Sequence, residues 1–310
     1  MMSFVIPCYR SQDSIEKVVD EICAVFTRQL FEVILVNDCS PDNTLAVIKE
    51  LCRKYANVRM LSFSKNFGQH SALMAGLRES VGDIVICMDD DGQTPPQEAT
   101  KLIDKINEGY DVVYARYDEK QHSIFRNFGS ALNNRMSELM LGKPRNLYMS
   151  SYVAMRRFVV DEIVRYENPY PYLGGLVLRT TSSITDVPVN HRKRTTGSSG
   201  YTLGKLISLW LNGFTSFSIK PLRVATVTGM VFSIFGFIFG IVIIIQKLLR
   251  PAEVQLGWTS NMAALIFIGG LILLVLGLVG EYLGRTFISL NKQPQYVIKE
   301  KLNTRTDKKD

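Results

Sequence analysis

The sequence predicts an α/β fold, a mostly parallel β-sheet with helices on both faces, followed by two transmembrane α-helices. Between residues 3 and 116, short apolar segments rich in Val and Ile alternate with segments of helical periodicity, a pattern typical of strands joined by helices. Two stretches of the second half, 224–246 and 261–280, carry no charged residue. The chain has 310 residues, 46% of them hydrophobic, which is enough for one sizeable domain and a membrane part.

Five segments are expected to be strands, because each is short, apolar and bounded by turn-forming or helical sequence. They are residues 3–7, 31–37, 58–63, 83–89 and 110–116. Apolar positions recur at helical spacing between them, as in 14–30. Ligands bind to such sheets beyond the carboxyl ends of the strands. The loops that follow the strands are therefore the expected place of a functional site.

The loop after the fourth segment is strongly acidic. Asp89, Asp90 and Asp91 are adjacent, and Gln93 follows before two prolines. Neighbouring carboxylates repel one another unless water or a cation screens them. In an extended chain Asp89 and Asp91 share a side, and Asp90 is expected to point away, toward the core edge or solvent. With the amide of Gln93, the two carboxylates offer hard oxygen ligands that suit Mg²⁺ or Mn²⁺ and leave positions for the phosphates of a nucleotide diphosphate. An acidic turn without a metal is the alternative.

The loop after the second segment also carries polar residues. Asp38 ends that strand, where a carboxylate can accept hydrogen bonds from a ribose or a base edge. Ser40 and Asp42 follow in the sequence Ser-Pro-Asp-Asn-Thr. For these two residues, capping of the next helix is the favoured interpretation.

Charge and cysteine content argue against several other classes. The net charge is +7, but the basic residues gather around the uncharged stretches and in the C-terminal tail, which fits anionic lipid better than nucleic acid. No basic stripe with interleaved aromatic residues is present, so no nucleic-acid partner is expected. The five cysteines lack a CxxC spacing and are odd in number, so neither a disulfide framework nor a zinc site is indicated.

Each uncharged stretch is long enough to cross roughly 30 Å of hydrocarbon as a helix. Two buried core helices are the alternative. Basic residues precede the first stretch and follow the second, which places the globular part and both termini in the cytoplasm. GxxxG spacings in both stretches could serve helix packing or a homo-oligomer.

The sequence therefore predicts four regions in the chain. They are a cytoplasmic globular domain at 1–200, an interfacial amphipathic region at 201–221, two transmembrane helices at about 224–246 and 261–283 within 222–285, and a cytoplasmic basic tail at 286–310.

Four motifs carry a resemblance to a known family. In order, they are VIPCYR at 5–10, VNDCSPDNT at 36–44, NFGQHSALMAGL at 66–77 and DDDGQTPPQE at 89–98. Together they resemble family 2 glycosyltransferases of the GT-A fold, and specifically the polyprenyl-phosphate glycosyltransferases. That group includes the dolichyl-phosphate mannose synthases, the bactoprenol glucosyltransferases and the aminoarabinose-type undecaprenyl-phosphate transferases. The resemblance continues through FTSFSIKPLR at 214–223 and the sequence 280–299 after the second stretch.

The resemblance implies a role for each matching residue. Asp38 would bind the uridine of a UDP-sugar, with Pro7 and Tyr9 lining the base pocket. The metal and the diphosphate would be held by Asp89, Asp91 and Gln93. Together with Asp91, the residues expected to act in catalysis are Arg116, Arg126 and Arg194. A loop pattern R-x-x-G-x-S-x-Y, which begins at Arg194, would add Ser199 and Tyr201 to substrate binding.

The implied activity is transfer of one sugar from a UDP-sugar to a polyprenyl phosphate, such as undecaprenyl phosphate. The reaction is expected on the cytoplasmic face of the inner membrane, with Mg²⁺ or Mn²⁺ and with inversion, in the making of envelope glycans such as lipopolysaccharide. A tetramer, as in some relatives, is a further expectation. A lipid phosphate is already ionised at neutral pH and needs no general base.

Three positions depart from the family pattern, one of them Gly200, where the family often has a basic residue in the loop before Tyr201. The acid of a D-x-G-x-F-R type motif falls on Leu147, and its arginine on Val153. These changes leave the donor sugar open and motivate an alternative, a non-catalytic nucleotide-sugar-binding membrane scaffold. A processive polysaccharide synthase is a second alternative, against which stand the missing QxxRW motif and the presence of only two expected spans.

Overall fold

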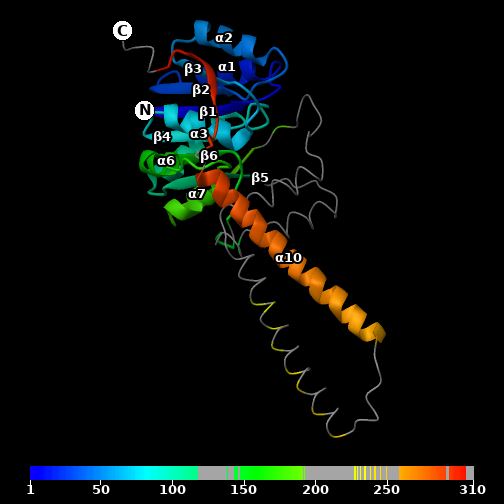
Figure 1. The fold of residues 1–310 in the computed structure, drawn as a ribbon. Helices are drawn as coiled ribbons and strands as arrows, with labels where there is room; N and C mark the ends of the chain where they lie inside the picture. Colours follow the sequence, from blue (N-terminus) through cyan, green and yellow to red (C-terminus); the bar gives the residue numbers. More distant parts are fainter. Residues whose placement is uncertain are drawn as a thin grey trace. The chain divides into compact units, whose positions relative to one another are not determined.

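The computed structural model (Figure 1) divides into two units, residues 1–208 with 292–310 and residues 209–291. The residues that it describes are 1–117, 138, 143–145, 147–190, 192, 227, 229, 231, 234, 238, 241, 245, 249, 258–290 and 293–304. The expected interfacial helix and most of the first expected span lie outside this set.

One sheet organises the first unit, with strands in the order β7-β5-β6-β4-β1-β2-β3-β8. The strands are β1 Met2–Cys8, β2 Phe31–Asn37, β3 Val58–Phe63, β4 Ile84–Cys87, β5 Val112–Tyr117, β6 Val153–Arg156, β7 Ile184–Val189 and β8 Ile298–Leu302. All five predicted strands are present, and the α/β fold class is confirmed.

The sheet is mixed rather than uniformly parallel. β4, β1, β2 and β3 run parallel to one another, and β7 runs parallel to β5. β6 lies between β4 and β5 and is antiparallel to both, while β8 is antiparallel to β3. The sequence did not predict β6, because four residues are too few to show a period. Its Val153 pairs with Cys87 on one side and Tyr114 on the other, which explains an apolar residue at this position.

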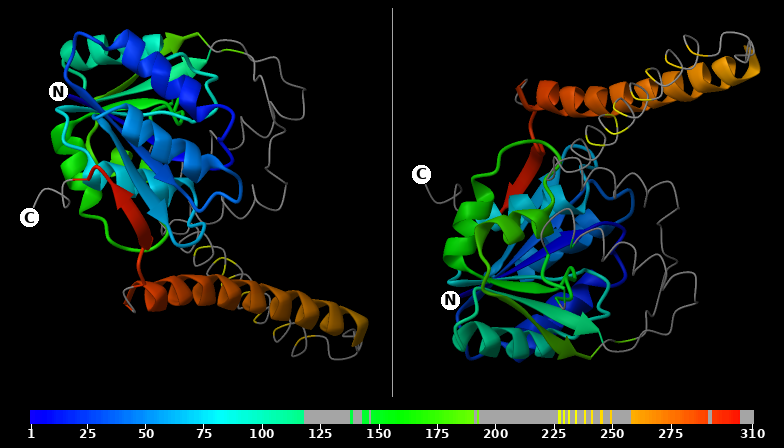
Figure 2. Two further views of the ribbon diagram at one scale, coloured as in Figure 1. Left: turned by 90° about the horizontal axis from the view of Figure 1, so that it is seen from above. Right: turned by 90° about the horizontal axis from the view of Figure 1, so that it is seen from below.

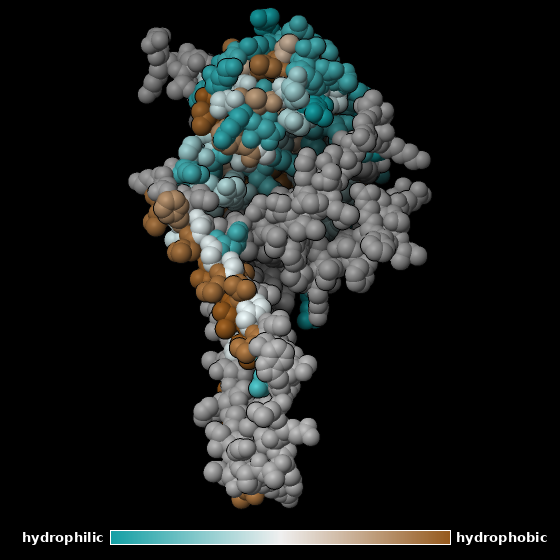
Figure 3. Space-filling model, turned by 45° about the vertical axis from the view of Figure 1, so that its right-hand side comes forward, coloured by the Kyte–Doolittle hydropathy of each residue, from teal (hydrophilic) through white to brown (hydrophobic). Residues whose placement is uncertain are grey.

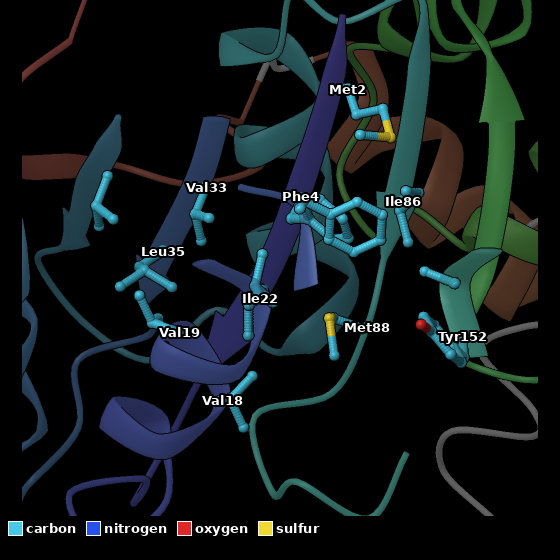
Figure 4. Packing of buried hydrophobic residues seen from close by; sticks show 14 of the residues in the cluster. Met2, Phe4, Val18, Val19, Ile22, Val33, Leu35, Ile86, Met88 and Tyr152 are labelled. Atoms are coloured by element: carbon cyan, nitrogen blue, oxygen red, sulfur yellow. The ribbon is translucent and has the colours of Figure 1, made fainter. Parts of the chain in front are cut away.

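Helices cover both faces of the sheet (Figure 2). In the first unit they are α1 Ile15–Val25, α2 Thr44–Lys54, α3 Gln69–Glu79, α4 Ala99–Asn107, α6 Arg157–Val164 and α7 Leu173–Thr180, with a short 3₁₀ turn at Pro96–Glu98. Because side chains alternate along a strand, Phe4 lies on one face of β1 and Val5 on the other. Figure 4 shows part of the cluster on the first face, including Phe4, Ile22 of α1 and Val33 of β2.

Glycine is required where the turn before β4 approaches β1. A Cβ added at Gly82 would lie 2.6 Å from the carbonyl carbon of Met2 and 2.6 Å from the backbone nitrogen of Ser3. Neither backbone atom can move without displacing the central strand. Gly82→Ala is therefore expected to lower the free energy of unfolding by about 3 kcal/mol, measured by urea denaturation. The exposed Asp104→Ala on α4 serves as the control, with a change of at most about 0.5 kcal/mol. Equal stability of both variants would contradict this packing.

The second unit contains α10, Trp258–Leu290, a helix of 33 residues. Large apolar side chains are exposed along it, among them Leu265, Ile272, Leu276 and Leu283, and Figure 3 shows hydrophobic residues along this helix. Within the part of the chain that the structure describes, no helix was found to be both long and apolar enough to cross a membrane.

Two segments of the expected basic tail at 286–310 have regular secondary structure. α10 continues to Leu290, and Ile298–Leu302 forms the edge strand β8 beside β3. The sequence of β8 alternates half-buried Ile298, Glu300 and Leu302 with exposed Lys299 and Lys301, so its lysines occupy one side of a strand.

The segment before β8 packs on the sheet and on α3 within the first unit. The Tyr296 ring stacks on Phe63 with ring centroids 5.1 Å apart, and its hydroxyl accepts a hydrogen bond from Arg78 of α3 at 2.9 Å. Gln295 donates to the carbonyls of Tyr166 and Asn168 at 2.9 and 2.7 Å. These contacts tie the segment that follows α10 to the sheet domain.

Candidate functional site

Four neighbouring parallel strands end at the same edge of the sheet, and each is followed by a loop with a residue in the left-handed region. The residues are Arg10 with φ 58, Cys39 with φ 53, Gly68 with φ 89 and Gly92 with φ 67. Non-glycine residues seldom adopt this conformation, and it gathers at functional sites. The carboxyl edge of β1 to β4 is therefore the candidate site, as the sequence predicts.

Asp89 follows β4 at this edge. Its two carboxylate oxygens accept hydrogen bonds from different elements, Oδ1 from Nε2 of Gln69 at 3.0 Å and Oδ2 from the Ser151 hydroxyl. Burial raises the pKa of Asp89 to about 6, and the charges of Asp91 and Asp90 add to the increase. An ionised Asp89 is costly here unless a positive charge is near. A divalent cation would supply that charge.

Asp91 and Gln93 form the rest of the predicted metal turn. Oδ1 of Asp91 accepts the backbone N–H of Gln93 at 3.0 Å, and the Gln93 carbonyl accepts the N–H of Arg192 at 2.7 Å. Among the described residues, no group of three or more His, Cys, Asp or Glu side chains is arranged to hold a metal. With the carboxylates of Asp89 and Asp91 and the amide of Gln93, the turn offers hard oxygen donors of the kind that fit Mg²⁺ or Mn²⁺.

Asp90 does not point toward the core edge or solvent, as the alternation of an extended chain suggested. The chain turns at Gly92, and Oδ2 of Asp90 accepts hydrogen bonds from the loop after β1, namely from the backbone N–H of Tyr9 at 3.1 Å and the hydroxyl of Ser11. Burial raises the pKa of Asp90, while these two donors oppose the increase.

Asp38 is buried and already has two partners. Its oxygens accept the backbone N–H groups of Phe67 and Gly68 at 2.7 and 2.8 Å, so the carboxylate fixes the loop that leads into α3. Burial raises the pKa of Asp38 against the effect of these two bonds. Of the predicted base-pocket residues, Pro7 is buried in β1, and Tyr9 is 45% exposed.

The capping interpretation of the loop after β2 agrees with the contacts. Oδ1 of Asp42 accepts the backbone N–H of Thr44, the first residue of α2, at 3.2 Å and the Thr44 hydroxyl at 2.6 Å. The hydroxyl of Ser40 also donates to Asp42. These bonds lower the pKa of Asp42, although partial burial opposes them.

Arg116, near the end of β5, is held by an acid that the sequence did not single out. Its Nη1 lies 2.8 Å from Oδ1 of Asp186 on β7, and Oδ2 of Asp186 accepts the backbone N–H of Tyr148 at 2.7 Å. The pairing of β5 with β7 brings the two elements together. The other predicted residues, Arg126, Arg194, Ser199 and Tyr201, lie outside the described residues.

Sequence reasoning missed three side chains of this edge, Gln69, Ser151 and Asp186. Gln69 begins α3 inside a motif that the sequence did single out, so its place at a helix start was the available signal. The sequence gives no comparable signal for Ser151 and Asp186, because their partners are distant in the chain. Leu147, at the family's acidic position, is buried.

His70 follows Gln69 and has a packing role. Its ring meets Tyr172 edge-on with centroids 5.2 Å apart, and burial lowers the pKa of His70 to about 4. The folded state therefore binds fewer protons than the unfolded state between pH 4 and the ordinary value of 6.5. The contribution of neutral His70 to the free energy of unfolding is fully present above about pH 6.5. It is lost as the pH falls toward 4.

Replacing His70 with phenylalanine removes this proton uptake. Between about pH 7.5 and about pH 4.5, the free energy of unfolding of His70→Phe is expected to fall by less than that of the wild type, the difference being at most about 3 kcal/mol. Urea denaturation at the two pH values measures it. Parallel losses in both proteins would show that His70 is not kept neutral by the fold.

Two family models match parts of this chain. Residues 3–164 match the family model for glycosyl transferase family 2, and residues 220–286 match the GtrB C-terminal hairpin. The chain is 32% identical to an undecaprenyl-phosphate 4-deoxy-4-formamido-L-arabinose transferase of Klebsiella pneumoniae (strain 342), over 96% of this chain and 92% of the relative. It is 30% identical to an uncharacterized glycosyltransferase of Bacillus subtilis (strain 168), over 96% and 93%.

A solved structure shares the fold. Glucosyl-3-phosphoglycerate synthase from Mycobacterium tuberculosis, in complex with Mn²⁺ and UDP-glucose, superposes with a TM-score of 0.54 at 18% identity, covering 69% of this chain and 77% of that one. The family match covers more than half of the chain, and the predicted resemblance is confirmed. The chain belongs to glycosyl transferase family 2 and is a glycosyltransferase.

Proposed function

We propose that the chain transfers a single sugar from a UDP-sugar to a polyprenyl phosphate, undecaprenyl phosphate in particular. The observation that carries the proposal is the acidic turn at Asp89 and Asp91, next to the loops of Tyr9 and Asp38 at one edge of the sheet. The Klebsiella relative, similar over nearly the whole chain, is named for an undecaprenyl-phosphate substrate, which supports the acceptor class.

The donor's nucleotide is assigned to the loops after β1 and β2. The exposed Tyr9 ring, with the Arg10 guanidinium 5.7 Å from its centroid, suits a flat base and a nearby phosphate. Each carboxylate oxygen of Asp38 can accept a further bond besides those from Phe67 and Gly68, so a ribose hydroxyl or base N–H can still bind. Pro7, buried behind this loop, can shape the pocket through its backbone. The similar Mycobacterium tuberculosis synthase was crystallised with UDP-glucose.

Mg²⁺ or Mn²⁺ would be held by Asp89, Asp91 and Gln93. When bound, the ion supplies positive charge that stabilises the departing diphosphate. Gln69 and Ser151 hold the Asp89 carboxylate in one orientation. The entropy cost of fixing this side chain when the ion binds is therefore small.

The proposed reaction is a single displacement. A phosphate oxygen of the lipid forms a bond to the anomeric carbon of the sugar, and the bond from that carbon to the UDP oxygen breaks, with its electron pair leaving on UDP. The anomeric carbon is inverted. No general base is required, because the lipid phosphate is already ionised. Arg116, oriented by Asp186, would neutralise phosphate charge, a role in which Arg126 and Arg194 remain predictions, as do Ser199 and Tyr201 in substrate binding.

The hairpin at 220–286 is proposed to anchor the enzyme at the cytoplasmic face of the inner membrane, with both termini in the cytoplasm. Support comes from the family match to this hairpin and from the two uncharged stretches in the sequence. A lipid whose phosphate lies at the headgroups could then reach a catalytic domain at the surface. A homo-oligomer remains a prediction from the GxxxG spacings.

Release of UDP tests the proposal. Detergent-purified protein is incubated with Mn²⁺ and a panel of UDP-sugars, including UDP-linked 4-deoxy-4-formamido-L-arabinose, with and without undecaprenyl phosphate. Release with one donor, dependent on the lipid phosphate and abolished by EDTA, is the expected result. UDP binding without release for every donor would instead support the scaffold, and release that undecaprenol without phosphate supports equally would contradict the acceptor.

A further inference from the structure

Three successive backbone N–H groups in the loop after β1 each donate to a side chain from another loop or from the start of α2. The Tyr9 N–H donates to Asp90 Oδ2 at 3.1 Å, the Arg10 N–H to the Ser40 hydroxyl at 2.8 Å and the Ser11 N–H to the Thr44 hydroxyl at 2.8 Å. The conformation at residues 9–11 is thus supported by side chains from other segments of the chain.

Asp90 holds the loop on both sides of its strained residue. Arg10 has φ 58, a conformation that persists only where the surroundings fix it. Tyr9 precedes it and Ser11 follows it, and one carboxylate oxygen of Asp90 accepts the N–H of Tyr9 and the hydroxyl of Ser11. Loss of that oxygen would remove one hydrogen bond on each side of the strained residue, while the bonds from Ser40 and Thr44 would remain.

The three adjacent acids have separate partners. Asp89 faces Gln69 and Ser151, Asp91 faces the backbone of its own turn, and Asp90 faces the loop after β1. Among the contacts of the described residues given above, Asp90 is therefore the side chain that joins the metal turn to the loop that carries Tyr9.

We infer that Asp90 is a positioning residue that couples the metal turn to the nucleotide-binding loop. This inference rests on the proposed function, since it presumes that Tyr9 meets the nucleotide. A nucleotide that orders Tyr9 would, through Asp90, also order the turn of Asp89 and Asp91, and the effect is reciprocal in binding free energy.

Replacement of Asp90 by two different side chains separates positioning from metal binding. Calorimetry would measure the Kd of UDP for Asp90→Ala and Asp90→Asn, both in EDTA and in Mn²⁺. Asp90→Ala is expected to bind UDP about tenfold more weakly in both solutions, because the loop loses its two bonds to Asp90 whether or not a metal is present. Asp90→Asn keeps a carbonyl oxygen that can accept both bonds and is expected to remain within about threefold of the wild type.

Two outcomes would overturn the inference. Wild-type affinity of Asp90→Ala would show that the loop needs no support from Asp90. Equal weakening of both variants in Mn²⁺ alone would make Asp90 a metal ligand instead. Asp104→Ala, which removes an exposed carboxylate from α4, is the matched control and should bind like the wild type.

Ser11→Ala tests the same contact if Asp90→Ala fails to fold. It deletes one of the two bonds to Asp90 and should weaken UDP binding in both solutions, with no further loss when combined with Asp90→Ala. Full additivity of the two losses would contradict the shared contact. Failure of the wild type itself to bind UDP would count against the proposed function rather than against the role of Asp90.

Discussion

Asp91→Asn is expected to lower the rate of sugar transfer by about 10³-fold while leaving the fold intact. The substitution removes a negative charge from the proposed metal turn, and with it the charge stabilisation of the leaving diphosphate. The retained carbonyl oxygen can still accept the N–H of Gln93, which the wild-type carboxylate accepts at 3.0 Å. The rate of UDP release at saturating donor and acceptor measures the loss, and circular dichroism verifies the fold.

The matched control for charge is Asp104→Asn on the surface of α4, which should keep wild-type activity. A second comparison varies the concentration of Mn²⁺. If Asp91 serves as a ligand, the residual activity of Asp91→Asn should need more Mn²⁺ for half-saturation than the wild type does. Near-normal turnover of the variant, at an unchanged Mn²⁺ requirement, would remove Asp91 from the metal site.

Arg116→Ala is expected to reduce kcat/KM by about 10²-fold, because a fixed guanidinium fork near the reacting phosphates would be lost. The Arg116 side chain is 44% exposed, while the side chain of its partner Asp186 is 7% exposed. The guanidinium is therefore accessible to a ligand, and the carboxylate that orients it is buried. Arg116→Lys restores charge but not the fork and should recover only part of the rate. Steady-state kinetics with donor and acceptor varied in turn provide the measurement.

Asp186→Asn tests whether orientation of Arg116 matters. It keeps an oxygen and an N–H group at the same place but weakens the ion pair, so a smaller loss of about tenfold is expected. Arg165→Ala, which removes an exposed arginine paired with Glu162 at 3.0 Å, is the control for positive charge and should leave the rate unchanged. A full rate in Arg116→Ala would assign the phosphate contacts to other arginines.

The parts of the fold that the sequence predicted are those with a strong local pattern. β1 to β5 are short apolar runs, and the acidic turn follows one of them directly. β6, β7 and β8 were missed because each is recognisable only through its partner: β6 has four residues, β7 includes a proline, and the alternation of β8 is hidden in a basic segment.

The same distinction holds at the candidate site. Asp89 and Asp91 were found from their spacing, which belongs to the chain itself. The direction of Asp90 was misjudged, because the turn at Gly92 ends the extended geometry from which it was argued. Gln69, Ser151 and Asp186 act through contacts between residues 20, 62 and 70 positions apart, and no local pattern reports such pairs.

The mass of the lipid product shows whether the enzyme transfers one sugar to undecaprenyl phosphate. Wild-type protein is incubated with undecaprenyl phosphate, Mn²⁺ and the donor that supports UDP release, and the lipid fraction is analysed by mass spectrometry. The account predicts one product, undecaprenyl phosphate carrying a single sugar through its phosphate, absent in EDTA and in Asp91→Asn. A ladder of products with several sugars, or UDP release with an unmodified lipid, would contradict it.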